Sequence, residues 1–220
     1  MAELKWDLSG QREFESGVRK VVLYPMGTSG YGAGVAWNGV TGITENPGGA
    51  DATDLYADDI KYATLRAAET FSCTIEAYTY PDEWNECDGS AEAETGVFLG
   101  QQPRKAFGLC YRTEIGDDAH PGMDKGYKLH IVYNSTASPS SRGYTTINDN
   151  PDAITFSWEA TSTPVEFSKQ EYKSHKAVST ITIDSTKVDS TKMTALEALL
   201  YGSANAEASL PSPDDILDLF

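Results

Sequence analysis

The segment FGLCYRTEI at residues 107–115 decides the fold class of this chain. Phe107, Leu109, Tyr111 and Ile115 alternate with small or polar residues, and Thr113 is the one polar residue in the apolar series. The segment YKLHIVY at residues 127–133 alternates in a similar way, and turn-forming residues separate the two segments. Alternation with a period of two is typical of a half-buried β-strand, so the pair predicts a β-hairpin.

Further strands are predicted on both sides of this hairpin. Segments rich in β-branched and aromatic residues lie at 18–24, 35–44, 71–80, 154–160 and 178–184. Pro25 and Pro81 are expected to end two of these strands, because proline donates no hydrogen bond to a sheet. Many short strands separated by turns are typical of an antiparallel β-sandwich or barrel, which is the predicted fold class.

One or two short α-helices are expected to flank the strands. Thr194 and Glu197 fit a capping box at a helix start, and Gly202 is placed to end that helix. The buried face of this helix is expected to hold Leu196, Leu199 and Leu200. A second short helix or turn is expected at residues 81–84.

The chain divides into three predicted parts. Residues 1–16 are polar and are expected to form an N-terminal arm, and residues 17–202 are expected to form the β domain. Residues 203–220 carry four acids and no base, and this C-terminal tail is expected to be mobile or ordered only by a neighbour.

A long loop is predicted at about residues 45–65. Its first fifteen residues hold five acids and no base, and NPGG at 46–49 is expected to break regular structure. Loops longer than about 12–15 residues are uncommon and are often functional. Because the predicted loop also contains apolar residues, it is expected to dock on another surface. The predicted interface residues are Glu45, Asp51, Asp54, Leu55, Tyr56, Asp58, Asp59, Ile60 and Tyr62.

Net charge and hydropathy exclude several classes of partner. The 220 residues include 33 acids and 17 bases, a formal charge of −16, which disfavours nonspecific binding to nucleic acid or to anionic membranes. No run approaches about 18 consecutive apolar residues, and the first residues are charged where a signal peptide is apolar. The chain is expected to be made in a cytoplasm and to stay soluble, without a membrane partner.

The sequence supplies no convincing catalytic, cofactor or metal motif. The three cysteines form no C-x-x-C pair and are expected to be reduced thiols, with Cys73 and Cys110 inside strands. His120, His130 and His175 lack a metal-ligand partner at helical or strand spacing and are expected at the surface. The glycine run at 30–34 matches no phosphate-binding pattern, and residues 148–152 only partly match a calcium loop. The chain is therefore predicted not to be an enzyme and to need no cofactor.

Several longer strings resemble the major tail (tube) proteins of long-tailed, non-contractile bacteriophages. They follow one another in order from about residue 17 to about residue 165. The strings are GVTGITE (39–45), ADATDLYADD (50–59), TIEAYTYP (74–81), FGLCYRT (107–113), GYKLH (126–130), ASPS (137–140), Tyr144, TIND (146–149), FSWE (156–159) and TPV (163–165).

The resemblance implies a β-sandwich with a flanking helix whose copies close into six-membered rings. Strands of the six copies would pair into one continuous inner β-barrel, and the rings would stack into a hollow tube. The loop at 45–65 would be the stacking loop that reaches the next ring. Its acids are expected to meet bases such as Arg19, Lys20, Arg104 or Lys105. The strands at 33–44 and 68–80, with two later ones, are expected to form the inner barrel.

The same resemblance implies partners and a location. The subunit would assemble in the host cytoplasm and reside in the virion, in the tail tube. Its partners would be further copies of itself, a tape measure protein, a tail terminator and a distal tail protein. Double-stranded DNA would pass through the lumen without specific binding, because an acidic wall repels phosphates.

Two other functions remain open at this point. A monomeric Ig-like adhesin or carbohydrate-binding module would share the sandwich and could use exposed aromatic rings. A glycoside hydrolase would need a cleft with convergent acids, for which Asp58-Asp59 and Asp117-Asp118 are the candidates, near Trp37, Trp84 or Trp158. Such acid pairs are more often solvated turns.

Overall fold

The computed structural model describes residues 3–119, 122, 124–147 and 152–220. About 45% of the chain is strand and 11% is helix, with antiparallel sheets, so the predicted mainly β class is confirmed. The strands are β1 (Phe14–Gly27), β2 (Gly30–Tyr31), β3 (Val35–Ala36), β4 (Val40–Gly49), β5 (Ala52–Ala57), β6 (Ile60–Arg66), β7 (Glu69–Ala77), β8 (Ala91–Glu94), β9 (Val97–Leu99), β10 (Phe107–Gly116), β11 (Gly126–Ala137), β12 (Phe156–Ser162) and β13 (Thr180–Asp184). The helices are α1 (Trp84–Cys87), α2 (Ser190–Tyr201) and α3 (Pro213–Leu219).

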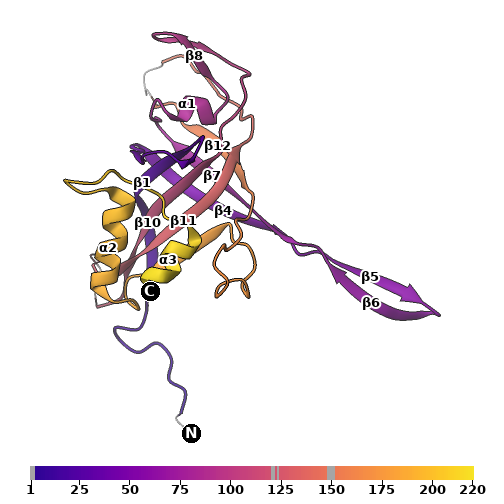
Figure 1. Cartoon of the computed structure of the whole chain (residues 1–220). Coiled ribbons are helices and arrows are strands. Elements are labelled where there is room, and N and C mark those ends of the chain that lie inside the picture. The colour runs from indigo at the N-terminus through magenta and orange to yellow at the C-terminus, as the bar shows by residue number, and fades with distance from the viewer. Residues whose placement is uncertain (1–2, 120–121, 123, 148–151) are drawn as a thin grey trace.

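One large antiparallel sheet forms the body of the molecule (Figure 1). Its main path runs β2-β1-β10-β11-β12-β7-β4, with β3 paired to β1 and β13 paired to β11. The predicted hairpin is confirmed as β10 and β11, whose register runs from Phe107 opposite Ser135 to Ile115 opposite Gly126. The strands β5 with β6 and β8 with β9 form two separate two-stranded sheets.

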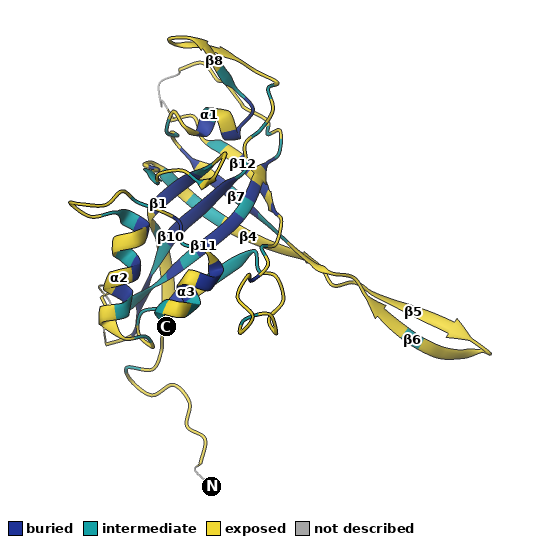
Figure 2. Ribbon diagram, in the orientation of Figure 1, coloured by how far each residue is buried: buried dark blue, intermediate teal, exposed yellow. Residues whose placement is uncertain are grey.

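The inner face of the sheet buries an aromatic core. Side chains of β1 and β10, such as Leu23 and Leu109, share one cluster with Ile75 of β7 and Trp158 of β12. The Trp158 ring lies 5.4 Å from the ring of Trp84, centroid to centroid. Figure 2 shows this band of buried strands at the centre of the body.

The opposite face of the sheet is covered by α2 and α3. Leu196 and Leu200 of α2 and Ile216 of α3 are buried against residues of β11 such as Leu129. The Tyr24 hydroxyl of β1 donates to the backbone carbonyl of Leu200 at 2.6 Å, which ties the helix to the sheet. Both faces of β10 are therefore largely buried, although its alternating sequence is typical of a half-buried strand.

The C-terminal segment is ordered by the chain itself, contrary to the prediction of a mobile tail. The Asp214 carboxylate accepts hydrogen bonds from the backbone N–H groups of Ser168 and Lys169 at 2.9 and 3.0 Å. Ser212 and Asp215 form a capping box at the start of α3. The acids that suggested a solvated tail are instead used to cap the helix and to hold a neighbouring loop.

The predicted helix exists, but its start was wrong. Asp189 is the N-cap of α2, and its side chain accepts from the N–H groups of Thr191 and Lys192. Thr194 lies inside the helix, where its hydroxyl donates to the Ser190 carbonyl at 2.8 Å. The stop at Gly202 is confirmed, with φ of 77°. Leu196 and Leu200 are buried as predicted, whereas Leu199 is exposed.

Several strand limits also differ from the predictions. β1 continues through Pro25, which lies opposite Phe107 in the ladder, so this proline does not end the strand. The NPGG segment does not break regular structure, because β4 pairs with β7 through Gly49. The short helix or turn expected at 81–84 is a turn at residues 82–83, and the helix α1 follows it from Trp84 to Cys87. The strands β8 and β9 were not predicted.

Candidate functional site: the projecting arm

The predicted long loop is a β-hairpin that projects from the body (Figure 1). Strands β5 and β6 form it, and a two-residue turn at Asp58 and Asp59 joins them. We call residues 50–68 the arm. The prediction of an irregular loop was therefore wrong, although its length and exposure were anticipated.

A break in the ladder sets the direction of the arm. The pairing of β4 with β7 ends at Gly49, whose φ is 75°, and Ala50 has φ of 57°. A Cβ atom on Gly49 would lie 2.4 Å from the Ala68 carbonyl oxygen, far inside contact distance. Only glycine fits here, because the backbone is left-handed and the partner strand is too close for a side chain.

The arm has one apolar face and one polar face. Residues opposite each other in a β-ladder share a face of the sheet. One face carries the pairs Thr53–Leu65, Leu55–Ala63 and Ala57–Ile60. The other face carries Ala52–Arg66, Asp54–Thr64 and Tyr56–Lys61. A register shift between Leu55 and Tyr56 leaves Tyr62 as the extra residue of a bulge.

No part of the described chain covers the apolar face. Leu55, Ile60 and Leu65 are 41%, 64% and 58% exposed, and Tyr62 is 75% exposed. Figure 2 shows the arm as almost wholly exposed. An isolated two-stranded hairpin is at best marginally stable in water, and clustered exposed apolar residues mark an interaction surface. The arm is therefore built to be covered by another surface.

Polar interactions fix the other face of the arm. The Lys61 ammonium lies 2.7 Å from the Asp54 carboxylate, and the Thr64 hydroxyl donates to the same carboxylate at 2.8 Å. Lys61 and Thr64 lower the pKa of Asp54 below its usual value. Because this pair is exposed, it contributes little to stability and serves mainly to hold the register.

Eight of the nine predicted interface residues lie on the arm or at its root. Asp51 stands at the root, where its carbonyl accepts from the Ala67 N–H at 3.1 Å. Leu65 belongs to the same apolar face and was missed. Its signal is present in the sequence as an apolar residue five positions after Ile60, but it fell at the end of the predicted loop.

Glu45 is separate from the other predicted interface residues. It lies within β4, where its carboxylate accepts a hydrogen bond from the Tyr111 hydroxyl. The Nδ1 atom of His130 lies 3.6 Å from the same carboxylate, and the His130 ring stacks on Tyr111 at 4.8 Å. His130, Tyr111 and burial act on Glu45, and its pKa is lowered, chiefly by His130.

A second carboxylate reaches the same histidine from β1. The Glu15 carboxylate lies 3.4 Å from His130 Nε2 and 2.5 Å from the Lys128 ammonium. Burial alone would raise the pKa of Glu15, but Lys128 and Thr113 outweigh it and lower the pKa. His130 was expected at the surface and is instead largely covered. This polar cluster joins β1, β4, β10 and β11.

One edge of the large sheet is open. β4 ends the strand order, and no strand of the described residues pairs along its outer side. An unpaired edge presents a row of free N–H and C=O groups that another chain can pair with. Pro47 is compatible with this position, because an edge strand tolerates the missing donor.

The residues considered for catalysis and sugar binding are partly buried and partly exposed. Trp37, Trp84 and Trp158 are all buried in the core, so these rings are not available to stack on a ligand. Asp117 is buried and ion-paired with Lys125 at 2.8 Å, so it is not the solvated turn residue that was expected. Asp58 and Asp59 form an exposed turn as expected.

The remaining histidines, the calcium-like segment and the cysteines indicate no further site. His175 is exposed as predicted, while His120 and most of the calcium-like segment at 148–152 lie outside the described residues. The cysteines are buried free thiols, Cys73 in β7 and Cys110 in β10 as predicted, and burial raises the pKa of each thiol to about 12. Among the described residues, no group of three or more potential ligands could hold a metal ion. No helix in the described ranges is both long and apolar enough to cross a membrane.

Comparison with known proteins adds no family assignment. No protein-family model matches the chain, and no curated protein matches it.

Proposed function

We propose that this chain is the structural subunit of a phage tail tube, which assembles from copies of itself and catalyses no reaction. The observation that carries the proposal is the projecting arm with an uncovered apolar face. In a monomer this hairpin leaves its apolar face in water and adds no stability. A stacked assembly buries the apolar face against the next copy.

The open edge of β4 supports the second contact that a tube requires. Copies within a ring would pair edge to edge, and closure of six copies would leave no free edge. The arm then contacts a different neighbour, along the tube. The sequence strings that resemble tail tube proteins overlap β4 (string 39–45), the first strand and the turn of the arm (50–59) and β7 (74–81), and β4 and the arm carry these two surfaces.

The acidic charge suits a conduit for DNA. A chain with 33 acids and 17 bases, repeated six times in a ring, repels phosphates wherever its acids face the lumen. In this proposal the tube resides in the virion and is assembled in the host cytoplasm. Tape measure, tail terminator and distal tail proteins are its proposed partners, and the DNA passes without specific binding.

Negative-stain electron microscopy of the purified protein tests the proposal. Rings or hollow tubes are expected above a threshold concentration. A variant in which a short turn replaces residues 51–67 keeps the β4–β7 ladder and is expected to remain folded without forming tubes. The matched control shortens the β8–β9 hairpin and keeps the arm. Normal tubes from the variant that lacks the arm would contradict the proposed role of the arm.

A monomeric glycan-binding module is the alternative, and it makes a different prediction. It would stay monomeric at high concentration and would bind oligosaccharides with or without the arm. The three tryptophans discussed above are buried, so such a module would have to use exposed rings such as Trp6, Tyr78 and Tyr144. Glycan-array binding by a monodisperse monomer would support that function and contradict the tail tube.

A further inference from the structure

The tip of the arm carries two unpaired negative charges. Asp58 and Asp59 have φ angles of 52° and 59°, so both central residues of the turn are left-handed. Turns of this kind favour Asn-Gly, because glycine and asparagine adopt positive φ at low cost. Among the described residues, no base lies within ion-pair distance of either carboxylate. The tip therefore presents adjacent charges that have no partner within the described chain.

Bases that lack an ion-pair partner are candidates to receive the acidic tip of the arm in another copy. Of the four bases considered from the sequence, Arg104 pairs with Asp88 at 3.7 Å and Lys105 with Glu86 at 2.5 Å. Arg19 and Lys20 form no ion pair with any described carboxylate. Lys20 lies between the shifted registers of β1, with φ of 50°, and such a bulge redirects a side chain away from the ladder.

Lys20 stands at the rim of an apolar groove. The groove has a volume of about 390 Å³ and lies between β1, β3 and the end of α2. Its lining includes Lys20, Val21, Val22, Gly34, Ala36, Trp37, Asn38, Tyr201 and Ala208. The Lys20 ammonium lies 5.1 Å from the centre of the Tyr201 ring. Lysine is the only charged residue of this lining.

A second hollow with a lysine is a weaker candidate. Lys173 lines a hollow of about 360 Å³, but Glu166 shares that hollow and offsets the charge. Arg19 lines a different hollow together with Arg112 and Lys125, but Glu114 and Asp124 line it too, and Arg112 and Lys125 are already ion-paired with Glu114 and Asp117. The groove at Lys20 differs from these two hollows because its lysine shares the lining with no acidic residue and lies beside an apolar floor.

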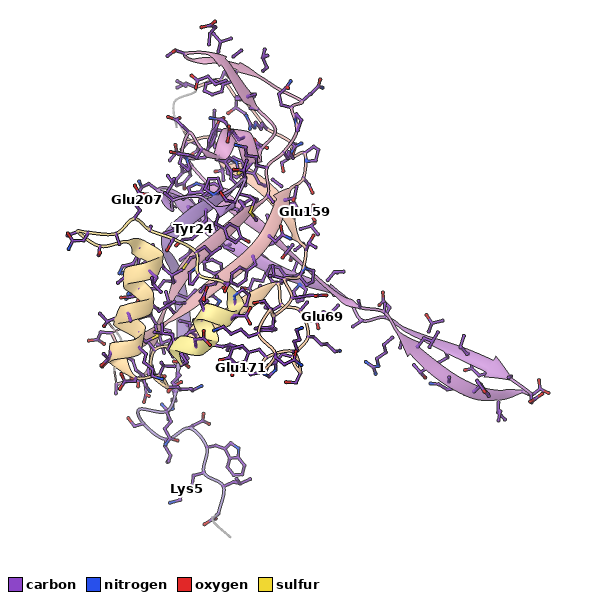
Figure 3. The ribbon with its side chains drawn as sticks, in the orientation of Figure 1. Lys5, Tyr24, Glu69, Glu159, Glu171 and Glu207 are labelled. Carbon is purple, nitrogen blue, oxygen red and sulfur yellow. The ribbon has the colours of Figure 1, made fainter. Side chains whose placement is uncertain are left out.

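The groove and the arm lie on opposite sides of the body. Figure 3 labels Glu69, at the root of the arm, and Glu207, across the body on the loop that follows α2. Ala208 of this loop lines the groove. Two complementary surfaces on opposite sides of a subunit generate head-to-tail contacts, in which each copy offers its arm to the next.

We infer that the Asp58–Asp59 tip of one copy docks in the groove beside Lys20 of the next copy along the tube. This inference rests on the proposed function and names the receptor for the arm. Ile60, which flanks the tip on the apolar face of the arm and is 64% exposed, lies against the apolar floor. The two carboxylates approach the Lys20 ammonium at the rim. The charge pair sets the orientation of docking, and the apolar contact supplies most of the affinity.

Crosslinking within assembled tubes tests the inference directly. The double variant Lys20→Cys with Asp58→Cys is treated with a short bis-maleimide and resolved on a denaturing gel. Multimers that form a ladder are expected, because each chain links to the next one. The matched control, Lys173→Cys with Asp58→Cys, is expected to give no ladder. The native cysteines are buried and remain unreacted.

The possible outcomes distinguish failure of the docking site from failure of the tail-tube function. Tubes without a Lys20–Asp58 ladder would overturn the docking site and leave the tail-tube function standing. A ladder in the Lys173 control alone would assign the tip to the other hollow and also overturn the inference. If the unmutated protein forms no tubes, both the proposed function and the inference fail.

Charge variants provide an independent readout. The double change Asp58→Asn with Asp59→Gly suits the turn better and removes both charges, so the hairpin is expected to stay folded. Its critical concentration for assembly is expected to rise about tenfold, as is that of Lys20→Glu, because interfacial charge pairs contribute on this scale. Adding Asp58→Lys to Lys20→Glu is expected to recover most of the loss. An unchanged critical concentration in both Lys20→Glu and the Asn-Gly variant would contradict the charge pairing.

Discussion

Replacing Leu55 and Leu65 by serine is predicted to weaken assembly without destabilising the monomer. Both side chains lie on the apolar face of the arm, and they are 41% and 58% exposed. Full burial of a leucine stabilises by about 1.5–3 kcal/mol. Covering the exposed half of each side chain therefore contributes about 1 kcal/mol, or about 2 kcal/mol for the pair. Since 1.4 kcal/mol corresponds to a factor of ten, the critical concentration is expected to rise about thirtyfold.

The assay is sedimentation of assembled protein across a concentration series, with thermal unfolding of the monomer measured in parallel. The unfolding midpoint is expected to change little, because surface substitutions usually alter stability by less than about 0.5 kcal/mol. Arg66→Ser is the matched control on the polar face, and it is expected to assemble almost normally. An unchanged critical concentration for the double serine variant would refute the claim that this face is buried in the assembly.

Three further predictions concern the body and the root of the arm. Gly49→Ala is expected to cost about 1–3 kcal/mol in unfolding free energy and to impair assembly, because the new Cβ atom meets the Ala68 carbonyl in a left-handed backbone; chemical denaturation checks this. Because the pKa of Glu45 is lowered in the folded protein, its ionised carboxylate stabilises the fold at pH values above the usual pKa of 4.5, and this stabilisation is lost as pH falls through the folded pKa. The variant Glu45→Gln should therefore flatten the acid side of a plot of stability against pH. Asp88→Asn is expected to destabilise by about 1–3 kcal/mol, because this buried carboxylate pairs with Arg142 and Arg104 and accepts a hydrogen bond from the Trp158 ring N–H; thermal unfolding measures the loss.

The sequence was sufficient to predict the fold class and the central hairpin, because both depend on local alternation. Phe107 to Ile115 alternates strongly, and the flanking turns separate it from the next strand. Helix limits were harder, since Asp189 and Thr194 are both good caps and the choice depends on how α2 packs. The C-terminal segment was misjudged because acids were counted as solvated, whereas Asp214 has partners distant in sequence.

The position of the candidate site in the chain was predicted from the sequence, but its hairpin structure was not. Acids and apolar residues at 45–65 indicated a surface that docks, yet the pairing of Leu55 with Ala63 makes it a hairpin with two distinct faces. Glu45 could not be separated from the arm by sequence, because its partner His130 is 85 positions away in the chain. The groove at Lys20 depends on three elements that meet only in the folded protein, so no local pattern could reveal it.

A cryo-electron microscopy reconstruction of the assembled protein tests the central claim most directly. Six-fold rings in a hollow tube are expected, with the arm of each copy covered by a copy in the next ring. An assembly in which the arms face solvent, or a protein that remains monomeric well above micromolar concentration, would contradict it.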